Sequence, residues 1–366
     1  MKRWFLYIGA CLLAFVCFAC TDEMEADGNS KERSVKLQLQ LSLPMDASAR
    51  TTRMKSGFEA GSKYENYINF NDEKNYRIYF FDTGNKYIAR FTPSKVVMTE
   101  ANDYVLYSVQ GTVPKELIPQ SGTKNFKIVV LGNWSKYEEP TSEIMLEELC
   151  NAEWAQFEYL KTFELSETNL IPFYGVHEYE DISFQYGEIT TLKESITLLR
   201  AMAKVEVVLK TEGMSFSSVS IQGYNQEGYC APSDVDSQED YDYDEDRPAL
   251  HLIGGKNDED AASQSLSFLH IEGEDYDTWI AYLPEYKNVG DKDLDAHIEV
   301  RFDIQTEEDE KDFIINFSDD QNDIANSSFD IVRNNLYRFN VTIDPKGKLA
   351  VEVNKWDEIF ENNFIF

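Results

Sequence analysis

The chain has 366 residues, and 34 Lys and Arg against 66 Asp and Glu give it a formal net charge of −32. This excess of acid argues against nucleic acid as a partner, because phosphate binding requires clustered Lys and Arg, and against electrostatic adsorption to anionic lipid. The hydrophobic share of 42% is sufficient for packed cores, and the length favours two domains over one. With 21 Tyr, 23 Phe and only 10 Pro, the composition indicates a β-rich globular protein.

An export signal is predicted at the amino terminus. Lys2 and Arg3 precede an apolar run, Trp4–Ala19, which is shorter than the roughly 20 residues that a membrane-spanning helix needs. A charged start, an apolar middle and small residues before a cleavage position are typical of a signal peptide, which we place at residues 1–19. No later segment is apolar enough to cross a bilayer, so we expect the mature chain to lie outside the membrane.

Cys20 is the predicted lipidation site. The stretch Cys17–Cys20 is similar to the processing signal of bacterial lipoproteins, with Cys17 in the position that usually holds Leu. Acyl chains on Cys20 would anchor the protein to the outer membrane without a spanning segment. Residues 20–34 form an acidic tether that resembles the export signal of surface lipoproteins of Bacteroides-type bacteria. An ordinary cleaved signal peptide is the alternative.

The clearest strand pattern lies near the start of the predicted mature chain. Apolar and polar residues alternate strictly over Val35–Leu43, and this period of two predicts a strand with one buried face. The apolar positions are Val35, Leu37, Leu39, Leu41 and Leu43. Pro44 ends the pattern, and the polar stretch Asp46–Lys55, which contains Arg50 and Arg53, is expected to be an exposed loop.

Many further short strands are predicted from apolar runs bounded by turn residues. In the first half we expect them at residues 76–81, 86–91, 104–109 and 126–131. One short helix is expected from Thr141 or Ser142 through Cys150. In the second half we expect strands at residues 217–223, 266–271, 279–283, 296–304, 313–317, 336–343 and 349–353.

The domain organisation follows from this succession of strands. A dense β region, Leu192–Lys210, is taken as the start of the second half. This gives an N-terminal β-sandwich over residues 35–190 and a C-terminal one over residues 191–366. Many short strands, regular turns and little helix predict an all-β fold of two tandem antiparallel β-sandwiches.

Sequence motifs for catalysis, cofactors and metals are absent. The chain has no nucleophile elbow, zinc-protease helix motif, phosphate-binding loop or dinucleotide fingerprint. The acidic loop Asp234–Asp246 could offer oxygen ligands to calcium, but it lacks the Gly and terminal Glu of an EF-hand, and a solvated loop is the simpler interpretation. We therefore expect no enzyme, no cofactor and no metal site. Whether Cys150 and Cys230 form a disulfide is left open by the sequence.

Six features spread in order along the mature chain carry a family resemblance. They are Arg77–Asp82, Phe126–Asn133, Ile171–Gly175, Leu199–Val207, Tyr282–Glu285 and the closing pair Arg333–Val341 and Val351–Trp356. Together they resemble the fimbrillin family, lipoprotein subunits of the type V pili of Bacteroides-type bacteria. The most telling is Leu199–Val207, since the family opens its second domain with Leu-x-Arg-x-x-Ala-Lys-Val. Ile171–Gly175 is similar to a turn in which Met stands in the place of Phe173.

The resemblance implies two transthyretin-like β-sandwich domains and a structural subunit of a cell-surface fimbrium that supports adhesion. It implies other fimbrial subunits as partners, a lipid anchor in the outer membrane and a ligand on a host or bacterial surface. Members of the family are cut after an Arg by a trypsin-like protease, which releases the first strand. Here Val35–Leu43 directly precedes Arg50 and Arg53, which is the layout that such activation needs.

A strand from another subunit is the expected replacement for Val35–Leu43. Loss of its five aliphatic side chains removes roughly 8–15 kcal/mol of burial, while a whole domain is stable by about 5–15 kcal/mol. An incoming strand would restore both the burial and the ladder hydrogen bonds. The candidate donor is Asp357–Phe366, with Phe364 and Phe366 on one side of an extended chain. Head-to-tail transfer makes an open filament. We expect the polymeric form to begin at Thr51 or Met54.

Other functions are compatible with the sequence. If Arg50 and Arg53 lie in a plain solvated loop, the protein keeps its first strand and its lipid and acts as an anchor, accessory or tip subunit of the same pilus. A glycan-binding or host-binding surface lipoprotein of similar fold would instead be a monomer that binds carbohydrate through exposed aromatic side chains. A hydrolase is a third alternative.

Overall fold

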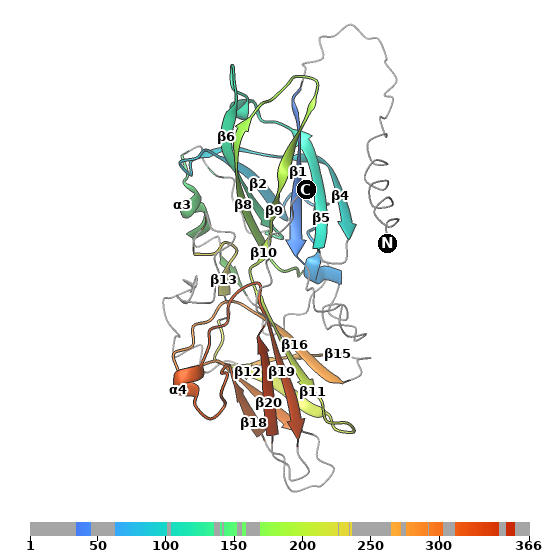
Figure 1. Cartoon of the computed structure of the whole chain (residues 1–366), viewed down its shortest axis with the longest axis vertical. Helices are drawn as coiled ribbons and strands as arrows, with labels where there is room; N and C mark the ends of the chain where they lie inside the picture. The colour runs from blue at the N-terminus through green and yellow to red at the C-terminus, as the bar shows by residue number, and fades with distance from the viewer. Residues whose placement is uncertain are drawn as a thin grey trace, which may run out of the picture. The chain divides into compact units, whose positions relative to one another are not determined.

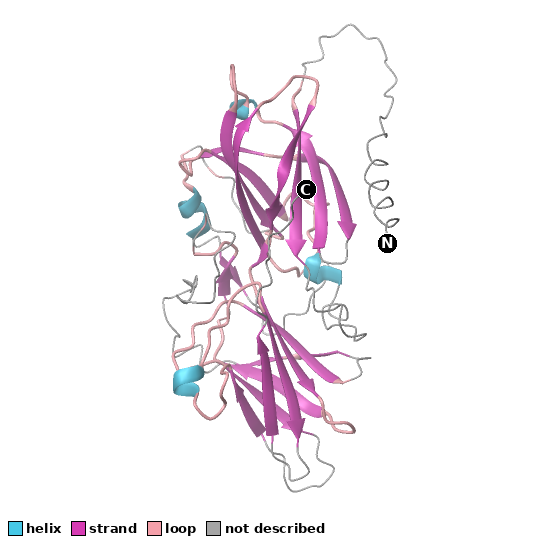
Figure 2. Ribbon diagram, viewed as in Figure 1, coloured by secondary structure: helices cyan, strands magenta, loops and turns pink. Residues whose placement is uncertain are grey.

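The computed structural model describes residues 34–44, 63–100, 104–134, 140, 143–151, 156–158, 169–225, 227–233, 235, 265–271, 276–291, 293–302, 312–343 and 349–355. They belong to a single compact unit, Ser34–Phe366. Strands make up most of its regular structure (Figure 2), and the helices of the described part are short connecting elements. The predicted all-β fold of two sandwiches is confirmed, because the four main sheets are arranged as two pairs.

The first sandwich contains a four-stranded sheet in the order β4-β5-β1-β9 and a five-stranded sheet in the order β10-β8-β6-β2-β3 (Figure 1). Its strands are β1 Lys36–Pro44, β2 Tyr76–Phe81, β3 Tyr87–Arg90, β4 Pro93–Glu100, β5 Tyr104–Thr112, β6 Lys124–Gly132, β8 Phe173–Ile182, β9 Ile189–Thr197 and β10 Leu199–Arg200. Its connections hold the 3₁₀ helices η2 Lys63–Asn66 and η3 Lys115–Leu117 and the helix α3 Leu146–Asn151. The pairing of β1 with β9 is parallel, and the other pairings in these two sheets are antiparallel.

The second sandwich contains sheets in the orders β15-β16-β11-β19-β20 and β14-β12-β17-β18. Its strands are β11 Ala203–Leu209, β12 Phe216–Gln222, β14 Ser265–Ser267, β15 Leu269–Ile271, β16 Asp277–Leu283, β17 His297–Phe302, β18 Asp312–Asn316, β19 Leu336–Ile343 and β20 Leu349–Lys355. The helix α4 Ile324–Ser327 lies between β18 and β19. A separate two-stranded ladder joins β7 Gln156–Glu158 to β13 Glu227–Tyr229, so it links segments that follow strands of different sandwiches.

The two halves share one topological feature. In each, the opening strand is an inner strand with one antiparallel and one parallel neighbour. β1 lies between β5 and β9, and β11 lies between β16 and β19. Both strands therefore hold together two neighbours that do not pair with each other in that sheet.

Aromatic side chains fill the cores, as the composition suggests. Phe80 lies 5.8 Å from Phe91 and 5.3 Å from Phe126 between ring centres, with the rings edge to face. In the second sandwich, Phe317 lies 5.2 Å from Phe339 in the same geometry. All five of these side chains are buried, and such aromatic pairs stabilise a core beyond the area that they bury.

Several predicted strands agree closely with the structure, and others differ from it. The strand predicted at residues 336–343 is β19. The single strand predicted at residues 266–271 is two strands, β14 and β15, which belong to different sheets because the chain crosses from one to the other at Phe268. The helix expected from Thr141 or Ser142 begins at Leu146. β4, whose side chains are largely exposed, has no counterpart among the predicted strands.

The expected turn at Ile171–Gly175 runs directly into a strand. Residues from Phe173 onward belong to β8. A Cβ atom on Gly175 would lie 2.6 Å from Leu198 Cδ2 and 2.8 Å from the carbonyl oxygen of Thr197. The glycine is therefore needed for close packing against the end of β9 and not for a turn.

The strand pairing also bears on the boundary between the sandwiches. β9 pairs with β1, and β10 pairs with β8, so both belong to the first pair of sheets. β11 is the first strand of the second pair. We propose that the boundary lies between Arg200 and Ala203, about ten residues after the predicted one at 190/191.

We expect Gly175→Ala to lower the free energy of unfolding by about 1–3 kcal/mol, because the added methyl group overlaps backbone and side-chain atoms of β9. Urea unfolding followed by tryptophan fluorescence measures the change. Gly84→Ala is the control, since its Cβ would meet only Asp82 Oδ1 at 3.3 Å. Equal losses for the two variants would contradict the packing argument.

Candidate functional site

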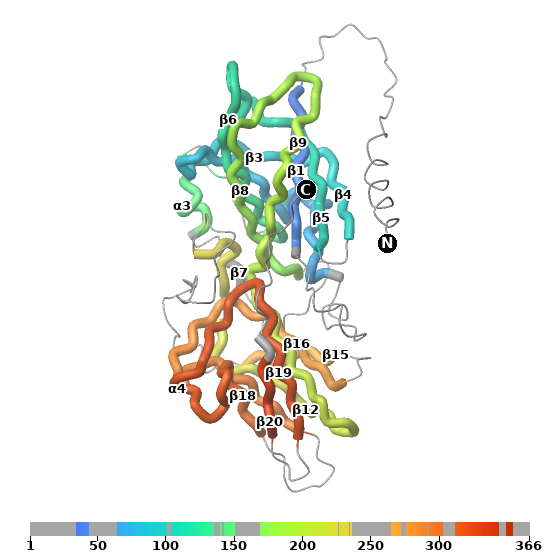
Figure 3. The backbone as a smooth tube through the Cα atoms, in the orientation of Figure 1, coloured from blue at the N-terminus to red at the C-terminus, as the bar shows by residue number. Residues whose placement is uncertain are grey.

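β1 is an inner strand although it is the first strand of the described chain. It pairs antiparallel with β5 along its whole length, from Lys36 opposite Thr112 to Pro44 opposite Tyr104. On its other side it pairs parallel with β9, which has no other partner in this sheet (Figure 3). Without β1, the facing edges of β5 and β9 would both be unpaired, which is an unfavourable state for two sheet edges.

The apolar face of β1 is fully buried. Val35 is 1% exposed, and Leu37, Leu39, Leu41 and Leu43 are each 0% exposed. The polar residues between them point to the other face and are partly exposed. The predicted alternation is thus confirmed, and burial of these five side chains is worth roughly 8–15 kcal/mol before entropy is counted. That is as much as the stability of a typical domain, about 5–15 kcal/mol.

The chain on either side of β1 lies outside the described residues. β1 ends at Pro44, and the description resumes at Lys63 in η2. Arg50 and Arg53 fall between these points, while Cys20 precedes β1 and Phe364 and Phe366 follow β20. Lipidation at Cys20, cleavage after either Arg and strand donation by the C-terminal segment therefore stay predictions.

β1 differs from its counterpart β11 in how it is joined to the rest of the protein. Only Ala201 and Met202 separate β11 from β10, and both are buried, so β11 is held in place by the chain before it. β1 is linked to η2 through residues 45–62, which lie outside the described residues. A cut between β1 and η2 would therefore separate β1 from the body, whereas β11 cannot be removed in this way.

The stretches that carry the family resemblance meet in space. Arg200 donates hydrogen bonds from its backbone nitrogen and from Nη1 to Asn334 Oδ1, at 3.2 and 3.1 Å. The neighbouring Arg333, which is 1% exposed, forms an ion pair with Glu285 at 2.9 Å. Residues 200, 285 and 333–334 come from three separate stretches of the sequence. Their side chains fix the region where the first sandwich continues into the second.

A chain of buried charges extends from this region. Glu65 of η2 is 2.9 Å from Lys204 Nζ, and Lys204 is 3.2 Å from Glu206. Glu206 in turn accepts a hydrogen bond from Arg338 Nε at 2.7 Å. Tyr282 donates its hydroxyl hydrogen to Glu65. Glu65, Lys204 and Glu206 are at most 3% exposed, so these charges depend on one another for compensation.

The two carboxylates respond differently to the same lysine. Burial raises the pKa of Glu65 above its ordinary value, although Lys204 and Tyr282 act in the opposite direction. Burial also acts to raise the pKa of Glu206, but Lys204 and Arg338 together outweigh it, so this pKa lies below its ordinary value. The difference lies in Arg338, a second cation at Glu206, since Lys204 itself is closer to Glu65, at 2.9 Å, than to Glu206, at 3.2 Å. In the sequence, Lys204 and Glu206 stand at alternate positions of a predicted β region, so their side chains share one face. That spacing could have indicated the ion pair, but the sequence was used only to predict a strand there.

The histidines are separate from one another. His177 lies 2.7 Å from Glu194, and His270 lies 2.8 Å from Asp277. Among the residues that the structure describes, no group of three or more His, Cys, Asp or Glu side chains is arranged to hold a metal ion. The described helices include none that is long and apolar enough to cross a membrane. Asp234 and Asp236 of the acidic loop lie outside the described residues.

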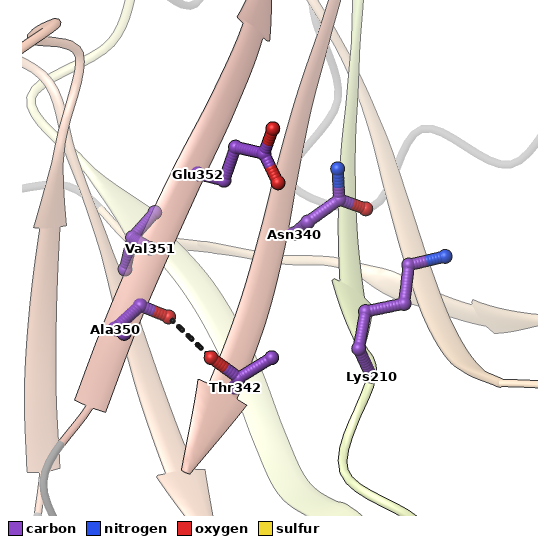
Figure 4. A pocket seen from close by; sticks show the side chains of 6 residues that line it. All are labelled: Lys210, Asn340, Thr342, Ala350, Val351 and Glu352. Carbon is purple, nitrogen blue, oxygen red and sulfur yellow. Dashed lines mark hydrogen bonds between the residues drawn. The ribbon is translucent and has the colours of Figure 1, made fainter. Parts of the chain in front are cut away.

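A shallow groove lies over β19 and β20 (Figure 4). It is lined by Lys210, Asn340, Thr342, Ala350, Val351 and Glu352. Lys210 Nζ lies 4.0 Å from the centre of the Tyr276 ring, and burial lowers the pKa of this lysine. Figure 4 shows its amino group directed away from Glu352. Because the polar groups diverge, the groove is better described as the surface of a sheet than as a ligand site.

Comparison with known proteins identifies one matching family and a set of similar solved structures. The sequence model of the family described as fimbrillin-A associated anchor proteins Mfa1 and Mfa2 matches residues 38–362. The tip fimbrial protein Mfa3 from Porphyromonas gingivalis, with C-terminal truncation, has a TM-score of 0.53 and 10% identity, covering 89% of this chain and 100% of that chain. The likeness to Mfa3 speaks for the fold alone. No curated protein matches the sequence.

A second solved structure is a fimbrial assembly protein from Parabacteroides distasonis ATCC 8503. It has a TM-score of 0.45 and 13% identity, covering 88% of this chain and 100% of that chain. A third, assigned to cell adhesion and from the same organism, has a TM-score of 0.48 and 15% identity, covering 90% of this chain and 99% of that chain.

We expect Leu39→Ala to lower the free energy of unfolding by about 2–5 kcal/mol, because it leaves a cavity in the middle of the β1 face. Gln40→Ala, on the opposite face of the same strand, is expected to stay within about 0.5 kcal/mol of the unchanged protein. Urea unfolding of the two variants provides the comparison. A loss at Gln40 as large as that at Leu39 would show that β1 is not held by its apolar face.

Lys204→Met is expected to cost about 3–5 kcal/mol at pH 7, since it leaves Glu65 and Glu206 buried without their shared cation. In the folded variant the pKa of Glu65, which burial already raises, should then lie further above its unfolded value, while Glu206 keeps Arg338. Stability is therefore lost as the pH rises through the unfolded pKa, and the variant should recover part of it as the pH falls toward 5.

Urea unfolding at pH 5 and pH 7.5 tests this dependence. Lys95→Met, at an exposed position of β4, is the control and should change stability little at either pH. A loss for Lys204→Met that is independent of pH would rule out the buried carboxylates as its cause.

Proposed function

Since this chain belongs to the family of fimbrillin-A associated anchor proteins, which its match over residues 38–362 shows, we propose that it is a fimbrial subunit that assembles by exchange of β1. The family and the similar structures are fimbrial or adhesion proteins, so the chain is a structural protein of the cell-surface fimbrium and not an enzyme. The observation that carries the strand-exchange proposal is the position of β1. It is an inner strand that joins β5 to β9 and whose apolar face is buried.

The proposed sequence of events begins with export. The protein is processed before Cys20, acylated there and carried to the outer membrane, with the acidic tether between the lipid and β1. A protease then cuts after Arg50 or Arg53, between the end of β1 at Pro44 and the start of η2 at Lys63. This site separates β1 from the body without breaking any described strand.

The vacated position then requires a strand with the features of β1. The open slot offers β5 as an antiparallel partner and β9 as a parallel partner, and it takes five apolar side chains at alternate positions. A neighbouring subunit supplies that strand through β-augmentation, and the C-terminal segment with Phe364 and Phe366 is the proposed donor. Head-to-tail donation then extends the fimbrium.

A second candidate role within the same fimbrium is favoured by the description of the family as anchor proteins. In that role the protein keeps β1 and its acylated Cys20 and attaches the fimbrium to the outer membrane, or it acts as an accessory or tip subunit. The geometry of β1 supports this state equally as the form before cleavage. The two roles differ in the first residue of the mature surface protein.

The experiment is to determine the first residue of the protein in isolated surface material and to run that material on SDS gels without heating. Strand exchange predicts Thr51 or Met54 as the first residue, together with SDS-resistant ladders. The double variant Arg50→Ala, Arg53→Ala should retain acylated Cys20 and lose the ladders. Lys55→Ala, in the same segment, is the matched control and should behave as the unchanged protein. Surface material of the unchanged protein that begins at acylated Cys20 would exclude cleavage and favour the anchor role.

A further inference from the structure

Two cysteines that the proposed function does not use lie buried in the described structure. Cys150 belongs to α3 and is 2% exposed, and Cys230 directly follows β13 and is 1% exposed. Both are free thiols in the structure. Strands of both sandwiches, β8 to β12, lie between them in the sequence, so any proximity between them comes from the tertiary fold.

The β7–β13 ladder brings the two segments together. Tyr229 of β13 lies opposite Gln156 of β7, and the two strands run antiparallel. Cys230 therefore follows the end of the ladder at which β7 begins, and α3 with Cys150 precedes β7 in the chain.

The two thiols contact neighbouring residues of β8, one thiol each. Cys230 Sγ donates a hydrogen bond to the carbonyl oxygen of Phe173 at 3.3 Å. The next residue, Tyr174, is hydrogen-bonded through its side chain to the thiol of Cys150. Tyr174 also donates its hydroxyl hydrogen to the carbonyl oxygen of Val235, five residues after Cys230, so the same side chain contacts the segment that follows Cys230.

The backbone at Cys230 is held from the other side. Arg333 donates from Nη1 to the carbonyl oxygen of Cys230 at 2.8 Å and from Nη2 to that of Tyr229 at 3.1 Å. Its ion pair with Glu285 fixes the guanidinium in turn. Cys230 is thus positioned by an anchored arginine on one side and by β8 on the other.

We propose that Cys150 and Cys230 form a disulfide in the exported protein, tying α3 of the first sandwich to the segment after β13. The inference rests on the proposed export, because disulfides form and persist in oxidising compartments outside the cytoplasm. If the N-terminal segment is processed as proposed and Cys20 is acylated, these two are the remaining cysteines of the mature chain. The bond would link covalently two regions that the described structure joins by a short ladder and side-chain contacts.

The chemistry requires an external disulfide, R–S–S–R, from an oxidoreductase or from oxidised glutathione. One cysteine thiol loses its proton and attacks a sulfur atom of R–S–S–R, giving a mixed disulfide and one thiolate. The second cysteine attacks the mixed disulfide, forms the Cys150–Cys230 bond and releases the second thiolate. The two protons pass to the leaving thiolates, so two R–SH molecules are formed for each protein disulfide.

Burial determines when this exchange can take place. In the folded protein, burial raises the pKa of Cys150 and raises that of Cys230 to about 12, so few thiolates are available. The bond therefore forms while the region between the sandwiches is still open during folding. Once closed, the same burial protects it from reductants.

The test is non-reducing peptide mapping of the full chain from surface material, denatured in the presence of an alkylating reagent. We expect a linked peptide pair that contains Cys150 and Cys230 and disappears on reduction. Reductant should also lower the melting temperature of the unchanged protein by about 5 °C or more and leave that of the Cys150→Ala, Cys230→Ala double variant unchanged. The single variant Cys230→Ser should yield alkylated Cys150.

Alkylation of both cysteines in the unchanged surface protein would overturn the inference, whatever happens to β1. If the protein does not reach the surface, the proposed function fails, and refolding of the full chain with a mixture of oxidised and reduced glutathione decides the inference separately. A Cys150–Cys230 link in the refolded chain supports it. Alkylation of both residues in the refolded chain overturns it.

Discussion

The burial of β1 between β5 and β9 is the interaction on which the first sandwich depends. This first strand joins β5 and β9, which do not pair with each other. Its five aliphatic side chains are within 1% of full burial. Loss of β1 would remove this burial and leave the facing edges of β5 and β9 unpaired. Under the proposed strand exchange, a strand from a neighbouring subunit restores both.

The second sandwich repeats the arrangement without the same freedom. β11 is also an inner strand between an antiparallel and a parallel neighbour. It is held in place by the two-residue connection from β10 and by the buried charges of Lys204 and Glu206. The helix η2 supplies Glu65 to the same network of charges. The residues just after the proposed cleavage segment are therefore attached to the second sandwich. Release of β1 would leave this attachment intact, which is what a subunit needs if only one strand is to be exchanged.

Three of the stretches that carry the family resemblance meet where the first sandwich continues into the second. Arg200 meets Asn334, and Arg333 meets Glu285, although these residues are far apart in the sequence. A buried guanidinium that loses its partner is costly, so each of these residues constrains the others. The stretches are recognisable in the sequence because they perform a structural task jointly, at the place where the chain passes from one sandwich to the next.

The alternation of Val35–Leu43 determined by itself that a strand with one buried face lies there, because a period of two leaves no other regular structure that separates apolar from polar residues. The abundance of Tyr and Phe and the spacing of short apolar runs likewise determined an all-β fold. The sequence could not determine which strands are neighbours, since pairing depends on contacts between residues far apart in the chain. Only the tertiary structure decided that β1 is an inner strand, that residues 266–271 divide between two sheets, and that Glu65 meets Lys204. It also brought Cys150 and Cys230 to neighbouring residues of β8, Tyr174 and Phe173, which no spacing of cysteines along the chain could have shown.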